Sequence, residues 1–156
     1  MTEASALLER YRRARLRIVT AESCTGGMVA ARLTDVAGAS DVVERGFVTY
    51  SNEAKAEMLA VPTALLTQYG AVSAQVARSM AEGALGQSRA DIAIAITGIA
   101  GPTGATPGKP VGLVYLAIAR RGRDTKVERQ QFGGDRQAVR EAAAERALEL
   151  LTAAVE

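Results

Sequence analysis

The stretch Leu16–Val36, LRIVTAESCTGGMVAARLTDV, decides the fold. Its first six residues are a short β-like run, and Met28, Val29 and Leu33 then recur at the spacing of one helix face. Between them lies the turn ESCTGG, which is rich in small residues. The order of strand, tight turn and helix predicts an α/β unit whose turn lies at the carboxyl end of a strand.

The flanking segments extend this unit into one domain. Periodicity and turn residues predict helices over 3–15, 52–60, 62–70, 74–85 and 135–150 and strands over 46–50, 91–97, 111–119 and 125–132. The last two strands are separated only by the turn RRGRD and should form a hairpin. We therefore expect a mixed parallel and antiparallel β-sheet covered by helices.

Composition excludes several classes of protein. Hydrophobic residues make up 48% of the 156, but no uninterrupted apolar run approaches the roughly 20 residues of a membrane span. The amino-terminal residues lack the apolar stretch of a signal peptide, and a single cysteine fits a reducing compartment. We expect a cytoplasmic protein with no membrane partner. With 19 basic against 17 acidic residues, the charge is too balanced to indicate a nucleic-acid partner.

The absence of histidine is the most informative feature of the composition. It excludes nucleophile activation by Ser-His or Cys-His pairs and every metal site that contains histidine. Any hydrolytic chemistry must therefore use another base. Lysine is the candidate to inspect, because there are only three: Lys55, Lys109 and Lys126.

The turn ESCTGG is the first candidate site. Gly26 and Gly27 let the backbone approach a ligand closely, and the unpaired N–H groups of the helix start can hold a phosphate or an oxyanion beneath Ser23. Alternatively, Ser23 or Thr25 merely caps the helix. Cys24 is another possible nucleophile, although without histidine its activation would depend on the helix terminus or on a lysine.

Lys55 and Tyr50 follow the second predicted strand in the sequence YSNEAK. Lys55 is 55 − 23 = 32 positions from Ser23, but both residues lie at strand-to-helix junctions, so the fold can bring them together. A lysine acts as a base only when burial or a neighbouring cation lowers its pKa. The alternatives are a solvated lysine in the first helical turn and a tyrosine whose hydroxyl lies at the surface.

The loop 97–112 is the third candidate site. It is rich in glycine and proline, but it lacks the spacing of a P-loop and is followed by a strand. Backbone N–H groups around Gly98 can still bind an anion, and Arg136 and Arg140 at the start of the last helix can supply guanidinium contacts. Alternatively, both arginines lie on a solvent-exposed face of this helix and bind no ligand.

Six segments taken together closely resemble the competence-damage-inducible CinA C-terminal family, which includes stand-alone nicotinamide-nucleotide amidases. The segments are TAESCTGG (20–27), ERGFVTYSNEAK (44–55), YGAVS (69–73), ITGIAGPTG (96–104), KPVG (109–112) and GDRQAVR (134–140). The resemblance runs from about residue 5 to 153. It implies a single three-layer α/β domain over residues 1–156, without the larger amino-terminal domain of fused family members.

The resemblance also implies an activity: hydrolysis of nicotinamide mononucleotide to nicotinic acid mononucleotide and ammonia, a step of pyridine-nucleotide salvage. Ser23 matches the nucleophile, Lys55 the base and Tyr50 an active-site partner of the two. Thr97 and Arg136 match positions in the substrate site. The mechanism would pass through an acyl-enzyme and would need no metal and no cofactor.

The residues expected to bind substrate are Thr25, Gly26, Gly27, Thr97, Gly98, Arg136 and Arg140. The partner is then a small nucleotide, and a homodimer or higher homo-oligomer is expected. Two other functions stay open at this point. One is a non-catalytic nucleotide-binding or sensor module of the same fold, and the other is a scaffold protein, which would neither bind nor turn over the nucleotide.

Overall fold

The computed structural model describes residues 2–156 and contains one five-stranded mixed sheet in the order β2-β1-β3-β4-β5. The strands are β1 (Ile18–Glu22), β2 (Val43–Val48), β3 (Ile92–Gly98), β4 (Leu113–Arg120) and β5 (Lys126–Gln131). β1 pairs in parallel with both β2 and β3, whereas β3–β4 and β4–β5 are antiparallel. The predicted mixed sheet and its terminal hairpin are confirmed.

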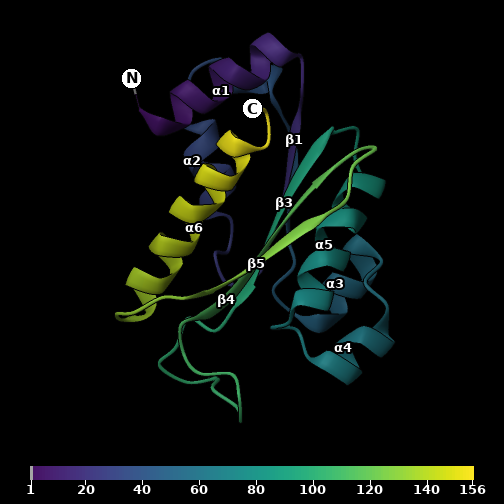
Figure 1. Ribbon diagram of the computed structural model, residues 1–156, viewed down its shortest axis with the longest axis vertical. Coiled ribbons are helices and arrows are strands. Elements are labelled where there is room, and N and C mark those ends of the chain that lie inside the picture. The colour runs from purple at the N-terminus through teal and green to yellow at the C-terminus, as the bar shows by residue number, and fades with distance from the viewer. Residues whose placement is uncertain (1) are drawn as a thin grey trace.

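Helices cover both faces of this sheet (Figure 1). Helices α1 (Glu3–Ala14), α2 (Met28–Thr34) and α6 (Arg136–Ala153) lie on one face, and α3 (Asn52–Leu59), α4 (Thr63–Tyr69) and α5 (Ala74–Gly86) on the other. A short 3-10 helix, Ala39–Asp41, precedes β2 and was not predicted. The three-layer arrangement is confirmed. Within residues 2–156, every helix is too short or too polar to cross a bilayer.

The burial of the central strand β3 on both faces explains why residues 92–96 form an unbroken apolar run. Ile92, Ile94 and Ile96 pack in the cluster beneath α1, α2 and α6, while Ala93 and Ala95 face α5. Because both faces of residues 92–96 are buried, the side chains there are all apolar, and the first polar one is Thr97 near the end of the strand. The alanines keep the α5 face flat, which allows α5 to lie close to the sheet.

The second strand differs from its predicted range of 46–50. It runs from Val43 to Val48, because it pairs with β1 only as far as Glu22. One further hydrogen bond, from the N–H of Thr49 to the carbonyl of Glu22 at 2.8 Å, ends the ladder, and the chain then turns into α3. Tyr50 therefore lies in the loop between strand and helix.

Candidate active site

The candidate site lies where β1, β2 and β3 end. Ser23 follows β1 directly, Lys55 lies in the first turn of α3 after β2, and Thr97 is near the end of β3. These segments enclose a pocket of about 180 Å³. It is lined by Ser23, Cys24, Tyr50, Lys55, Ala71, Val72, Thr97, Gly98, Ala100 and Arg136.

Ser23 and Lys55 are in direct contact. Lys55 Nζ lies 3.0 Å from Ser23 Oγ, and the exposed fractions of the two residues are 1% and 8%. The amine also contacts two backbone carbonyls, those of Thr49 at 2.9 Å and Tyr50 at 3.2 Å. The fold thus joins two side chains 32 positions apart, and the solvated alternative for Lys55 is wrong.

Burial changes the protonation of Lys55. Removal from water disfavours the ammonium form and lowers its pKa from 10.5 to about 8. At neutral pH about a tenth of the amine is then uncharged. The three contacts suit both forms: the ammonium donates to all three oxygens, whereas the neutral amine keeps two N–H bonds to the carbonyls and turns its lone pair toward the Ser23 hydroxyl.

Local sequence places Lys55 at this depth. The Ser51 hydroxyl caps α3 by accepting the N–H of Ala54 at 3.0 Å, which fixes the helix start beside the end of β2. At the other end of α3, a Cβ on Gly83 of α5 would lie 1.9 Å from the carbonyl oxygen of Leu59. This glycine lets α5 touch the backbone of α3 and hold it against the sheet.

Arg136 and Tyr50 stand together at the pocket. The Arg136 guanidinium donates to the Tyr50 hydroxyl at 3.0 Å and to the carbonyl of Gly101 at 2.8 Å. Tyr50 is 61% exposed, and it reaches Lys55 through its backbone carbonyl, not through its hydroxyl. The Thr97 hydroxyl donates to the carbonyl of Ala71 at 2.9 Å and so ties β3 to the opposite wall.

The start of α2 is already occupied by the protein's own carboxylate. Glu22, fully buried at the end of β1, accepts the N–H groups of Val29 at 2.9 Å and Ala30 at 3.1 Å. The N–H of Gly26 is engaged as well, with the carbonyl of Ser23 at 3.0 Å. These helix-entry amides are therefore not free for a phosphate, contrary to the expectation from sequence.

Four of the predicted substrate-binding residues lie outside the lining of this pocket: Thr25, Gly26, Gly27 and Arg140. Arg140 instead holds the turn from the outside, donating to the carbonyls of Cys24 at 2.9 Å and Thr25 at 3.3 Å.

Glu22 was overlooked as a functional residue. The signal available was an acidic residue that ends an apolar strand and precedes a helix whose N-cap, Gly27, has no side chain to cap it.

Cys24 is a poor nucleophile in this setting. Its side chain is buried, and burial raises the pKa of the thiol to about 11. The reactive form of cysteine is the thiolate, which is scarce at neutral pH when the pKa is this high. The geometry therefore favours Ser23 over Cys24.

Comparisons with known proteins place this geometry in a family. The model of the CinA C-terminal domain matches residues 2–155. The chain belongs to the CinA C-terminal domain family. Nicotinamide-nucleotide amidohydrolase PncC of Escherichia coli K12 is 54% identical over 134 residues, which cover 86% of this chain and 81% of that protein. A CinA-like protein of Akkermansia muciniphila is 56% identical over 133 residues, 85% of this chain.

Solved structures of CinA proteins share the fold. The competence/damage inducible protein CihA of Agrobacterium tumefaciens superposes with a TM-score of 0.96 at 48% identity, covering 99% of this chain and 94% of that one. A CinA superfamily protein of Escherichia coli gives 0.93 at 39% identity, covering 97% and 88%. The chain spans about a third of the length of the first curated relatives it matches, the Akkermansia protein among them.

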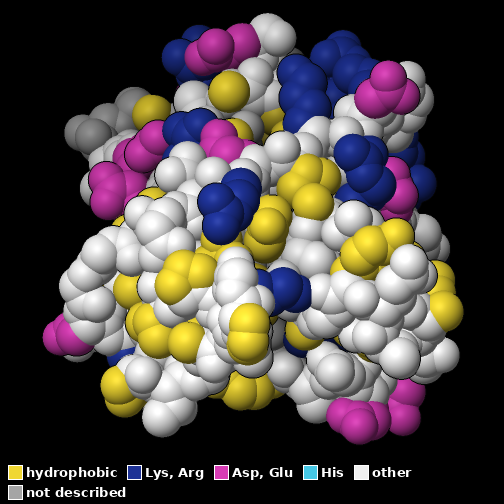
Figure 2. Space-filling model, turned by 60° about the horizontal axis from the view of Figure 1, so that its bottom comes forward, with side chains coloured by type: hydrophobic (Ala, Val, Ile, Leu, Met, Phe, Trp, Pro, Cys, Tyr) yellow, Lys and Arg dark blue, Asp and Glu magenta, His cyan; other side chains and the backbone are white. Residues whose placement is uncertain are grey.

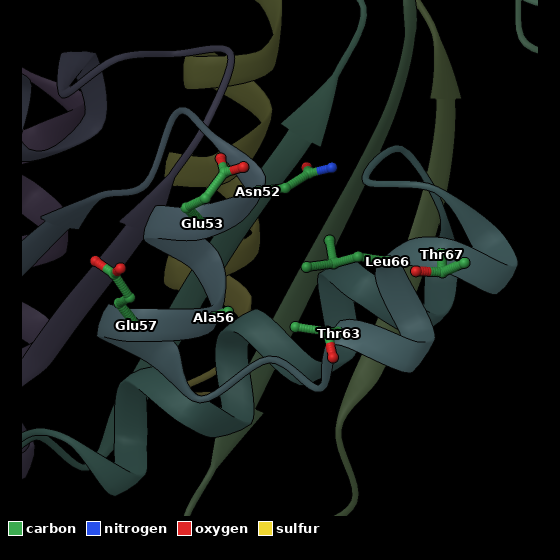
Figure 3. A pocket seen from close by; sticks show the side chains of 7 residues that line it. All are labelled: Asn52, Glu53, Ala56, Glu57, Thr63, Leu66 and Thr67. Atoms are coloured by element: carbon green, nitrogen blue, oxygen red, sulfur yellow. The ribbon is translucent and has the colours of Figure 1, made fainter.

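This CinA C-terminal domain also carries hollows that are larger than the Ser23 pocket. One of about 490 Å³ lies beside the start of α6 and is lined in part by Arg136 and Arg140. Another, of about 380 Å³, lies between α3 and α4, where Glu53, Glu57 and Leu66 contribute to its lining (Figure 3). The second shares no residue with the Ser23 pocket.

Proposed function

We propose that this chain is an amidohydrolase that converts nicotinamide mononucleotide to nicotinic acid mononucleotide and ammonia, with Ser23 as nucleophile and Lys55 as general base. The observation that carries the proposal is the 3.0 Å contact between Ser23 Oγ and the buried amine of Lys55. The name of the Escherichia coli relative PncC, a nicotinamide-nucleotide amidohydrolase of similar length, supports the choice of substrate.

The reaction begins with the neutral form of Lys55. The carbonyls of Thr49 and Tyr50 can only accept hydrogen bonds, so they hold the two N–H groups and direct the lone pair toward Ser23. Lys55 then takes the hydroxyl proton as Ser23 Oγ forms a bond to the carboxamide carbon. Burial supports this step, because a pKa of about 8 leaves some neutral amine at physiological pH and still makes it a useful base.

The tetrahedral intermediate needs donors for its oxyanion. Among the described residues 2–156, we find no hydrogen bond from the N–H groups of Cys24 and Thr25 to another residue, and Cys24 directly follows the nucleophile. We assign the oxyanion to these amides in place of Gly26. Lys55 passes its proton to the departing nitrogen, so that the C–N bond breaks and ammonia leaves.

Hydrolysis of the resulting ester repeats these roles with water. Lys55 removes a proton from the water as its oxygen attacks the ester carbon, and the proton returns to Ser23 Oγ when the ester bond breaks. The product is nicotinic acid mononucleotide. Each turnover thus consumes one water, releases one ammonia and restores the Ser23 hydroxyl.

The pocket is large enough for only the nicotinamide ring of such a substrate. At about 180 Å³ it is smaller than the roughly 300 Å³ at which pockets for whole small-molecule ligands begin. The ribose and phosphate must extend outward past Arg136, which lines both this pocket and the neighbouring one beside α6. Figure 2 brings the lower end of Figure 1 forward; some basic side chains lie near its middle, and others lie toward its upper edge beside acidic side chains.

The test is ammonia release from nicotinamide mononucleotide, with nicotinic acid mononucleotide identified as the second product. We expect turnover by the wild type and a loss of at least about 1,000-fold in Ser23→Ala and Lys55→Met. Ser88→Ala and Lys126→Met are matched controls, because both side chains lie away from the pocket. Nucleotide binding without ammonia release by the wild type would contradict the proposal and favour a sensor module.

A further inference from the structure

Two side chains of opposite charge hold the turn that carries Ser23. Glu22 ends β1 immediately before Ser23, and Arg140 reaches the turn from α6. The Glu22 carboxylate accepts the N–H groups of Val29 and Ala30, just beyond the turn. The Arg140 guanidinium donates to the carbonyls within the turn. Neither side chain lines the Ser23 pocket.

The Arg140 contacts constrain the direction of a backbone amide. In a trans peptide the C=O and the next N–H point in opposite directions. When Arg140 binds the carbonyl of Cys24, it therefore turns the N–H of Thr25 away from α6. That amide is one of the two proposed for the oxyanion, so the guanidinium sets the direction of a donor that it does not touch.

The turn is shaped to admit the guanidinium. Gly26 has a φ of +59°, in the left-handed region, and a Cβ at this position would lie 3.2 Å from an Arg140 terminal nitrogen. A larger residue would combine an unfavourable backbone conformation with a tight contact to Arg140. Gly26 thus leaves room for the Arg140 guanidinium, whereas the sequence alone indicated that this glycine lets a ligand approach the backbone.

We propose that Arg140 and Glu22 are positioning residues that hold the Ser23 turn, and that the Arg140 guanidinium, although it also lines the hollow beside α6, is committed to the turn carbonyls and not to the substrate phosphate. The proposal rests on the proposed amidase function for its kinetic consequences. Its structural content, that the guanidinium orders the turn, is independent of that function. Four charge-assisted bonds to four different peptide groups keep the Ser23 hydroxyl and the amides after it in one arrangement.

The experiment compares Arg140→Ala with Arg136→Ala in steady-state turnover of nicotinamide mononucleotide. We expect Arg140→Ala to lower kcat by about 10- to 100-fold with KM within about twofold, because a misplaced nucleophile and oxyanion site affect the transition state and not ground-state binding. Arg136→Ala, which removes a cation from the pocket, should raise KM. Arg140→Lys keeps the positive charge but lacks the planar guanidinium that donates to both carbonyls, so it should give an intermediate kcat.

A second measurement does not depend on activity. Amide hydrogen exchange reports the N–H groups of Gly26 and Met28, which donate to Ser23 and Thr25 within the turn. We expect exchange at both to rise at least about tenfold in Arg140→Ala and in Glu22→Gln, with β3 amides unchanged. Glu22→Gln tests the other end of the turn, since a glutamine offers one oxygen to two N–H donors.

The outcomes separate the alternatives. A rise in KM of about tenfold or more in Arg140→Ala with kcat and exchange unchanged would overturn the proposal and make Arg140 a substrate ligand. Unchanged kinetics and unchanged exchange would also overturn it, by making the arginine a bystander. If the wild type releases no ammonia, the amidase function fails, and the exchange measurement still decides whether Arg140 and Glu22 order the turn.

Discussion

Burial of Lys55 should make the stability of this protein depend on pH in a defined direction. The side chain is 1% exposed, and its pKa falls from 10.5 in water to about 8 in the folded state. Between these values the unfolded chain binds a proton that the folded chain has released. Raising the pH from about 8 to about 10.5 therefore favours folding.

The magnitude follows from the shift. A difference of about 2.5 pKa units at 1.36 kcal/mol each amounts to roughly 3 kcal/mol, an unfavourable contribution that is fully present below pH 8 and disappears by about pH 10.5. Lys55→Met removes the titrating group. The free energy of unfolding of the wild type minus that of Lys55→Met should accordingly increase by about 3 kcal/mol across this interval.

Urea unfolding at a series of pH values from about 7 to 10.5 measures this difference, because the titration of groups that do not interact with Lys55 cancels between the two proteins. Lys126→Met is the matched control, since it makes the same change of side chain at an exposed position. A flat difference for Lys55→Met would refute the depressed pKa. A difference that falls with rising pH would reverse the sign of the reasoning.

Four shorter predictions follow from the same contacts. The ratio kcat/KM should rise about tenfold per pH unit below about 8 and level off above it, as Lys55 becomes neutral; a profile that is flat from pH 6 to 9 would exclude this base. Gly83→Ala should lower the free energy of unfolding by more than about 2 kcal/mol in urea, because its Cβ would collide with the carbonyl of Leu59; an unchanged midpoint would show that α3 and α5 separate freely. Tyr11→Phe should cost about 1 to 2 kcal/mol, because the buried hydroxyl donates to the carbonyl of Leu151 at 2.7 Å. Cys24 should react with iodoacetamide at pH 8 at least about 100-fold more slowly in the folded than in the urea-unfolded protein, since its pKa of about 11 leaves little thiolate; rapid alkylation would revive the cysteine as a nucleophile.

The fold was largely predictable because its elements carry strong local signals. The continuous apolar run at 91–97 and the strand-turn-helix order at 16–36 are local patterns that the tertiary structure keeps. The end of β2 was wrong by two residues, since GFVTY continues as a strand by propensity but loses its partner when β1 ends at Glu22. Pairing across the sheet, which local propensity does not contain, decided that boundary.

The sequence predicted which residues form the site better than it predicted how they contact one another. Absence of histidine and the position of each residue after a strand made Ser23 and Lys55 candidates, and the resemblance to the CinA C-terminal family then assigned them as nucleophile and base. The burial of Lys55 was not predictable, because NEAKAE is typical of an exposed first turn, and only the contacts of its amine with Ser23, Thr49 and Tyr50, with α3 packed on α5, remove it from water. The contacts of Glu22 and Arg140 likewise depend on which helices lie beside the turn, and sequence spacing does not show which helices these are.

The most direct test of Ser23 as nucleophile is the mass of the peptide that contains it, measured after acid quench of the wild type during turnover of nicotinamide mononucleotide. We expect an ester of nicotinic acid mononucleotide on Ser23, with neither adduct nor turnover in Ser23→Ala. Turnover by Ser23→Ala at the wild-type rate, with no adduct on the wild-type peptide, would contradict it.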